Sequence, residues 1–137
     1  MAIQIKTLDQ LKLMRKAGLV VGETLSLIRE AIKEGVTTND LNEIAVKNLA
    51  ANKAKPNFLN YHGYPAVICA SINDEIVHGI PNDRPIKSGD IVSIDFGAII
   101  EGWHGDSAIS VICGSGDPED QKLLDVCEES MWVGIAA

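Results

Sequence analysis

The chain has 137 residues, the length of a single domain, and 12 basic against 19 acidic side chains give it a net charge of −7. With 46% hydrophobic and 23% charged residues it has the balance of a folded globular protein, which excludes intrinsic disorder and collagen-like structure. The acidic charge argues against nucleic acid as the main partner, no apolar run is long enough to span a membrane, and the N-terminus lacks a secretory pattern. Three cysteines without metal-like spacing favour a reducing, cytoplasmic compartment.

Two helices are predicted over the first part of the chain. Thr7 and Gln10 have the spacing of a capping box, and apolar residues follow at helical intervals: Leu11, Met14, Ala17, Val21, Leu25, Ile28 and Ile32. Gly35 is expected to end this helix. A second helix is expected to begin at Thr37 or Thr38 and to be closed by Pro56.

From residue 57 onward, short apolar runs alternate with turn residues, which is typical of strands. Four strands are predicted: Ala66–Ala70, Ile76–Ile80, Asp90–Ile99 and Trp103–Cys113. Pro118 suits the first turn of a last helix. Helices followed by a run of strands predict an α+β fold with an antiparallel sheet. Residues 131–137 are apolar and offer no cap, so we expect that the chain stops inside an element.

Two carboxylates in neighbouring predicted strands are the clearest candidate site. Asp95 lies inside the run Ile91–Gly97, and Asp106 lies in the next strand. A turn at Ile100-Glu101 makes them directly opposite, with Cβ atoms about 5 Å apart, and a turn at Glu101-Gly102 makes them diagonal neighbours about 7–8 Å apart. Either register puts both on one face of the sheet. Three interpretations stay open: a divalent cation between them, a shared raised pKa without metal, and a solvated sheet face.

His78 and three nearby residues are further candidates. His78 ends an apolar run beside a glycine, where an imidazole could act on a substrate or have a structural role. Tyr61 and Tyr64 could wall a pocket or pack a turn. Cys69 is by itself expected to be a small buried apolar residue. The chain has no nucleophile elbow, phosphate loop or Cys-x-x-Cys pair, so these motifs lend no support to a serine hydrolase, a nucleotide-binding protein or a structural zinc site.

Five ordered motifs closely resemble those of type I methionine aminopeptidases. They are Tyr61-His62-Gly63-Tyr64-Pro65, Cys69-Ala70-Ser71-Ile72-Asn73, His78-Gly79-Ile80-Pro81, Ser88–Asp95 and Gly102-Trp103-His104-Gly105-Asp106. The resemblance covers essentially the whole chain, and its helical start is similar to the short prokaryotic form. It implies the first half of a pita-bread fold, an antiparallel sheet with flanking helices, so that residues 1–137 are the N-terminal half of one peptidase domain.

The resemblance also implies a dinuclear centre of divalent ions (Co, Mn, Fe or Zn) that removes the N-terminal methionine from nascent proteins. The aspartate matching Asp95 binds one ion in such enzymes, and the one matching Asp106 bridges both. The histidine matching His78 contacts the scissile amide region and is expected to be catalytic. The implied partners are nascent polypeptides beginning with Met, with the ribosome surface as a further candidate, and neither nucleic-acid readout nor a membrane.

Residues matching Tyr61, Tyr64 and Cys69 contribute to the pocket for the methionine side chain in that family. The family's other metal ligands, a histidine and two glutamates, lie in its second half, and the three histidines of this chain match none of them. Two alternatives therefore stay beside the enzyme: a catalytically incomplete fragment that associates with another chain, and a non-enzymatic binding protein of the same fold.

Overall fold

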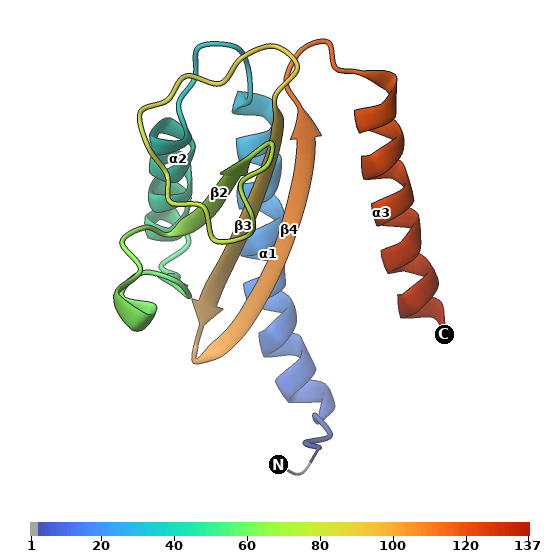
Figure 1. Ribbon diagram of the computed structural model, residues 1–137. Coiled ribbons are helices and arrows are strands. Elements are labelled where there is room, and N and C mark those ends of the chain that lie inside the picture. Colours follow the sequence, from blue (N-terminus) through green and yellow to red (C-terminus); the bar gives the residue numbers. More distant parts are fainter. Residues whose placement is uncertain (1–2) are drawn as a thin grey trace.

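A computed structural model describes residues 3–137. The elements in chain order are α1 (Leu8–Ala31), α2 (Thr38–Ala51), β1 (Lys55–Pro56), a short 3₁₀ helix η1 (Tyr61–Gly63), β2 (Ile68–Ile72), β3 (Ile91–Ile100), β4 (Trp103–Ile112) and α3 (Pro118–Ala136). Figure 1 shows α1 running behind the sheet and α3 standing beside β4, on the side away from α2. All strand pairs are antiparallel, which confirms the predicted α+β class.

Side-chain caps begin both N-terminal helices. The Gln10 amide donates to Thr7 Oγ1 at 3.3 Å and the Thr7 amide donates to Gln10 Oε1 at 2.9 Å, so the predicted capping box is present. Thr37 and Asp40 form a second capping box at the start of α2. Two predicted ends were wrong. The first helix ends at Ala31, before Gly35, and the second ends at Ala51, well before Pro56.

The sheet is built around β3. The whole of β3 pairs with β4 along one edge, while β2 and β1 share its other edge, with Ile68–Ile72 opposite residues 92–96 and β1 opposite residues 98–99. Side chains alternate between the two faces of β3. Four are buried against the core of α1 and α2: Val92, Ile94, Phe96 and Ala98. The alternate residues Ser93 and Asp95 therefore lie on the opposite face, called here the open face.

The strand predicted at Ile76–Ile80 is wrong. The chain turns after β2, with Asn73 at φ +55°, and then runs irregularly beside β2. His78, with φ +73°, is in the left-handed region, which an extended strand excludes. Ile76 and Val77 are mostly exposed, so their apolar character does not reflect burial in a sheet. The other three predicted strands exist with shifted ends, the largest shift being from Ala66–Ala70 to Ile68–Ile72.

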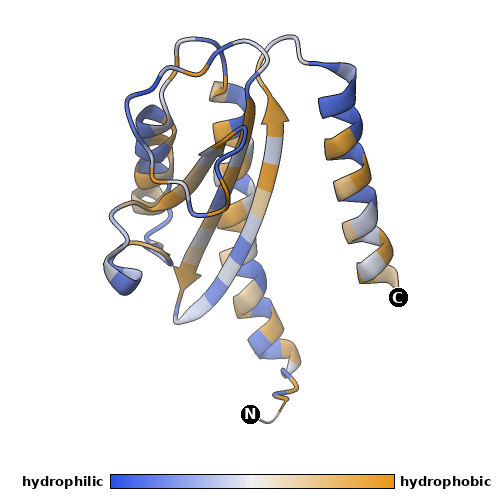
Figure 2. Ribbon diagram, viewed as in Figure 1, coloured by the Kyte–Doolittle hydropathy of each residue, from blue (hydrophilic) through white to orange (hydrophobic). Residues whose placement is uncertain are grey.

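The last helix differs from α1 and α2 because it buries none of its side chains. Asp117 caps its N-terminus by accepting a hydrogen bond from the Glu119 amide at 2.8 Å, and Pro118 is in the first turn as predicted. Figure 2 shows apolar residues spread along this helix. Within residues 3–137 no helix combines the length and apolarity needed to cross a membrane.

Candidate functional site

The hairpin of β3 and β4 determines how the two carboxylates lie. Asp95 pairs with Ala108 and Gly97 pairs with Asp106, so the two aspartates are diagonal neighbours on the open face. This register selects the second of the two predicted turns. Glu101, at φ +52°, precedes Gly102 in the turn, and both adopt the left-handed conformation that a tight hairpin of this kind requires.

The two carboxylates are close enough to interact electrostatically. Partial burial, and after it the charge of Asp106, raises the pKa of Asp95, while the nearby His78 lowers it by a smaller amount. Asp95 is half-buried and Asp106 is exposed. A cation between the two groups would remove their repulsion, and carboxylate oxygens are ligands that Mn²⁺ and other divalent ions accept.

The donor set present is only part of a metal site. Among residues 3–137 no group of three or more His, Cys, Asp or Glu side chains is arranged to hold an ion. Asp95 and Asp106 fit two ligand positions by chemistry and by sharing a face. The remaining ligands of a stable centre would have to come from outside these residues.

An apolar pocket of about 550 Å³ opens beside Asp95. It brings together most of the candidate residues that the sequence singled out: Tyr61, Tyr64, Cys69, His78 and Asp95. Asp106 does not line it. Phe58 and Ile80 also line the pocket, and the sequence analysis missed both. Ile80 lies within the motif His78-Gly79-Ile80-Pro81, and Phe58 lies three residues before the motif that begins at Tyr61, and this closeness to the motifs is the signal that could have found them.

Tyr64 takes part in the pocket through its hydroxyl as well as its ring. The phenol lies 2.8 Å from the carbonyl oxygen of Gly79 and 3.1 Å from that of Ile68. Burial and, after it, the neighbouring Cys69 raise the pKa of Tyr64, so the hydroxyl keeps its proton and donates. Burial also raises the pKa of the Cys69 thiol. Cys69 is therefore a neutral, buried side chain, which agrees with its expected apolar character.

His78 lies at the pocket's edge with an exposed side chain. Within the described part of the chain its imidazole forms no hydrogen bond. The ring is thus available to a ligand in the pocket, beside Asp95.

Asn57 is a polar neighbour of Asp106 that the sequence analysis missed. Its Nδ2 atom lies 3.5 Å from Asp106 Oδ2 and 3.4 Å from the carbonyl oxygen of Gly105, while its Oδ1 atom lies 3.1 Å from His104 Nδ1. A Cβ atom at Gly97 would overlap the Asn57 side chain, so glycine is required there. An asparagine in a connecting segment carries no sequence signal for this role.

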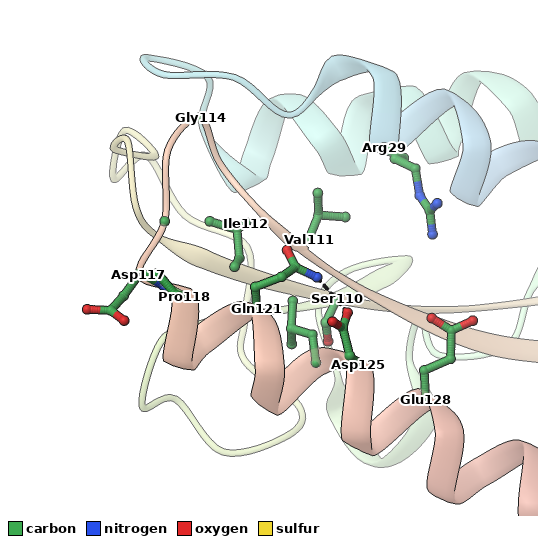
Figure 3. Close-up of a pocket in the computed structure, with 12 residues that line it drawn as sticks. Arg29, Ser110, Val111, Ile112, Gly114, Asp117, Pro118, Gln121, Asp125 and Glu128 are labelled. Atoms are coloured by element: carbon green, nitrogen blue, oxygen red, sulfur yellow. Dashed lines mark hydrogen bonds between the residues drawn. The ribbon is translucent and has the colours of Figure 1, made fainter.

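A second pocket, of about 520 Å³, lies between β4 and α3. Figure 3 shows Arg29 of α1 directed into this space, with Gln121, Asp125 and Glu128 along α3. Gln121 Nε2 donates to Asp125 Oδ1 at 2.7 Å, which holds these two side chains together on the helix. Neither Asp95 nor His78 lines this pocket, so we do not place the chemistry there.

Comparison with known proteins identifies the family of the chain. Residues 12–137 match the sequence pattern of metallopeptidase family M24. The chain belongs to this family. Among its relatives, methionine aminopeptidase of Aquifex aeolicus is 48% identical over 98% of this chain and 55% of that protein. Methionine aminopeptidase 1 of Bacillus subtilis is 44% identical over 95% of this chain and 52% of that protein.

Solved structures share the fold. The crystal structure of methionine aminopeptidase from Rickettsia prowazekii superposes with a TM-score of 0.93 at 40% identity, covering 96% of this chain and 53% of that one. The prolidase from Pyrococcus furiosus, at 20% identity and a TM-score of 0.76, shares the fold alone. The chain is thus a homologue of type I methionine aminopeptidases with a partial pita-bread fold, as its motifs indicated. It spans about half the length of the relatives that it matches.

Proposed function

We propose that residues 1–137 are the N-terminal half of a methionine aminopeptidase domain, and that the complete protein removes the N-terminal methionine from nascent polypeptides. The observation that carries this proposal is the diagonal pair Asp95 and Asp106 beside an apolar pocket that His78 also lines. The similarity to methionine aminopeptidases supports the same conclusion. We further propose the cytoplasm as the compartment, with the ribosome surface as a candidate partner.

In this proposal Asp95 and Asp106 would hold divalent ions (Co, Mn, Fe or Zn), Asp95 one of them and Asp106 both. Ions of this kind polarise carbonyl groups and lower the pKa of water. The contribution of the hairpin is geometric, because β3 and β4 hold the two carboxylates on one face without a flexible loop between ligand and sheet.

The pocket supplies the specificity for methionine. Its lining is mainly apolar and aromatic, and the rings of Tyr61 and Tyr64 with the Cys69 thiol suit an unbranched thioether side chain. A methionine placed there brings its own carbonyl and amide towards Asp95. His78, at the edge of the same pocket, is then in reach of the scissile amide, where it can donate or accept a hydrogen bond.

The test is carried out on the full-length protein. Asp95→Asn and Asp106→Asn are each expected to abolish most release of methionine from a Met-Ala-Ser peptide and to lower the metal stoichiometry measured by calorimetry. Asp106→Asn should be the more damaging, since its carboxylate would serve two ions. Asp74→Asn, at an exposed position in the turn after β2, is the matched control and should change neither quantity. Unchanged stoichiometry in both site variants would overturn the assignment.

A further inference from the structure

Three hydrogen bonds hold the backbone of Gly79. Its carbonyl oxygen accepts hydrogen bonds from the Ala70 amide of β2 at 2.9 Å and from the Tyr64 hydroxyl at 2.8 Å. Its amide donates to Ser71 Oγ at 3.1 Å. Both backbone hydrogen-bonding groups of Gly79 are therefore satisfied, although the segment around it belongs to no helix or strand.

Space at Gly79 is as restricted as its hydrogen bonding. A Cβ atom at this position would overlap the carbonyl oxygen of Ala70 and come within 2.9 Å of Ser71 Oγ. Only glycine lets the segment approach β2 so closely. The preceding residue, His78, has φ +73°, an unusual conformation for a residue with a side chain. Contacts with β2 and with Tyr64 thus hold the backbone at Gly79, directly after His78.

Tyr64 and Ser71 contact the Gly79 backbone from two different parts of the chain. Tyr64 follows the 3₁₀ helix, and its hydroxyl also lies 3.1 Å from the carbonyl oxygen of Ile68, so that it bridges β2 and the 76–80 segment. Ser71 is a buried residue of β2 itself. Neither hydroxyl is needed to line an apolar pocket. The Tyr64 hydroxyl has the Gly79 carbonyl as a partner, and the Ser71 hydroxyl has the Gly79 amide.

We propose that Tyr64 and Ser71 are positioning residues, which hold the His78 imidazole at the pocket beside Asp95 by fixing the backbone of Gly79, the next residue. The proposal rests on the proposed function, in which His78 contacts the substrate. It assigns to the Tyr64 hydroxyl a role separate from that of its ring in the pocket. It predicts that the two hydroxyls matter for turnover through His78 and not through binding of the methionine side chain.

The first measurement does not depend on activity. Hydrogen exchange of the Ala70 amide in the full-length protein reports how firmly the segment is held, because this amide donates to the Gly79 carbonyl. Tyr64→Phe and Ser71→Ala are each expected to speed this exchange on the order of 10-fold. Tyr61→Phe removes a phenol oxygen from the same pocket, and Ser110→Ala removes a hydroxyl that bonds to Ser93. Both controls should leave the exchange rate unchanged.

The second measurement separates positioning from pocket lining. Tyr64→Phe keeps the ring, so kcat should fall about 10-fold while KM stays within about twofold. In a His78→Ala background the same substitution should cause no further loss, since an effect that acts through His78 disappears with it. Ser71→Ala should behave in the same way.

The outcomes distinguish this proposal from the proposed function. If the parent protein releases no methionine, the proposed function fails, while faster Ala70 exchange in the two variants still supports the clamp on Gly79. Unchanged exchange overturns the clamp whatever the activity. A raised KM with unchanged kcat in Tyr64→Phe, or a full additional loss in the His78→Ala background, overturns the positioning role and leaves Tyr64 as a pocket wall only.

Discussion

At the scale of single residues, His78 combines an exposed imidazole with a left-handed backbone conformation. Because it is close to Asp95 without belonging to the carboxylate pair, its loss should affect turnover more than metal content. His78→Ala in the full-length protein is expected to lower kcat on the order of 10²-fold, the contribution of a positioned acid–base or polar group. Steady-state kinetics and metal analysis of the same sample test this. A variant that arrives metal-free, or that cleaves Met-peptides at the normal rate, would show that the role is wrong.

Residue types and strand periodicity were enough to predict that Asp95 and Asp106 share a face, because a shift of register by two residues does not change the face. They were not enough to choose the register. That choice depends on Glu101 adopting a positive φ before Gly102, which a residue with a side chain rarely does. Asn57 could not be predicted at all, since its contact with Asp106 joins segments far apart in the sequence.

At the scale of elements, a buried carboxylate anchors the start of β3 to the loop that precedes it. Asp90 accepts hydrogen bonds from Asn73 Nδ2 at 2.8 Å and from the Lys87 amide at 3.0 Å, and Arg84 lies 3.3 Å away. Asp90→Asn replaces one of the two accepting carboxylate oxygens by an NH₂ group, which can only donate. We expect a loss of about 1–3 kcal/mol in the free energy of unfolding at neutral pH. Urea denaturation measures it, with the exposed Asp74→Asn as control.

The same carboxylate gives a pH dependence with a definite sign. Although burial raises the pKa of Asp90, the hydrogen bonds from Asn73 and the Lys87 amide and the charge of Arg84 outweigh it and lower the pKa. A lowered pKa in the folded state means that the stabilisation is present above the usual value of 3.8 and is lost as the pH falls through the folded-state value. The stability difference between the parent protein and Asp90→Asn should therefore shrink below pH 3.8. A difference that stays constant down to pH 2 would contradict this account.

Helix starts were predictable where helix ends were not. Thr7 with Gln10 is a local signal read from four residues, and the structure contains the capping box. The end of α1 at Ala31 depends on where the chain must leave to begin α2, which is a tertiary constraint. The wrong strand at Ile76–Ile80 has the same origin. The segment lies beside β2, but only the backbone of Gly79 is hydrogen-bonded to that strand, and the apolar residues of the segment are exposed.

At the scale of the whole molecule, α3 exposes apolar side chains that no other described element covers. Its exposed apolar side chains are each between 51% and 66% accessible: Leu123, Val126, Met131, Trp132, Val133 and Ile135. Soluble monomers rarely expose contiguous apolar patches of more than a few hundred Å². At about 25 cal/mol per Å², covering even a few hundred Å² favours association by several kcal/mol.

We therefore expect the 137-residue chain, expressed alone, to be oligomeric or prone to aggregation and to lack aminopeptidase activity, since residues 3–137 hold only the two carboxylates of a metal site. Light scattering on the purified chain, with a Met-Ala-Ser peptide assay in the presence of Mn²⁺ or Co²⁺, tests both statements. Val126→Lys with Val133→Lys should shift the population towards monomer by removing apolar surface from α3. Leu19→Lys with Val46→Lys makes the same kind of change at exposed positions of α1 and α2 and should leave association unchanged. A soluble monomer that releases methionine at an enzyme-like rate would contradict both expectations, and it would require metal ligands beyond Asp95 and Asp106 within these 137 residues.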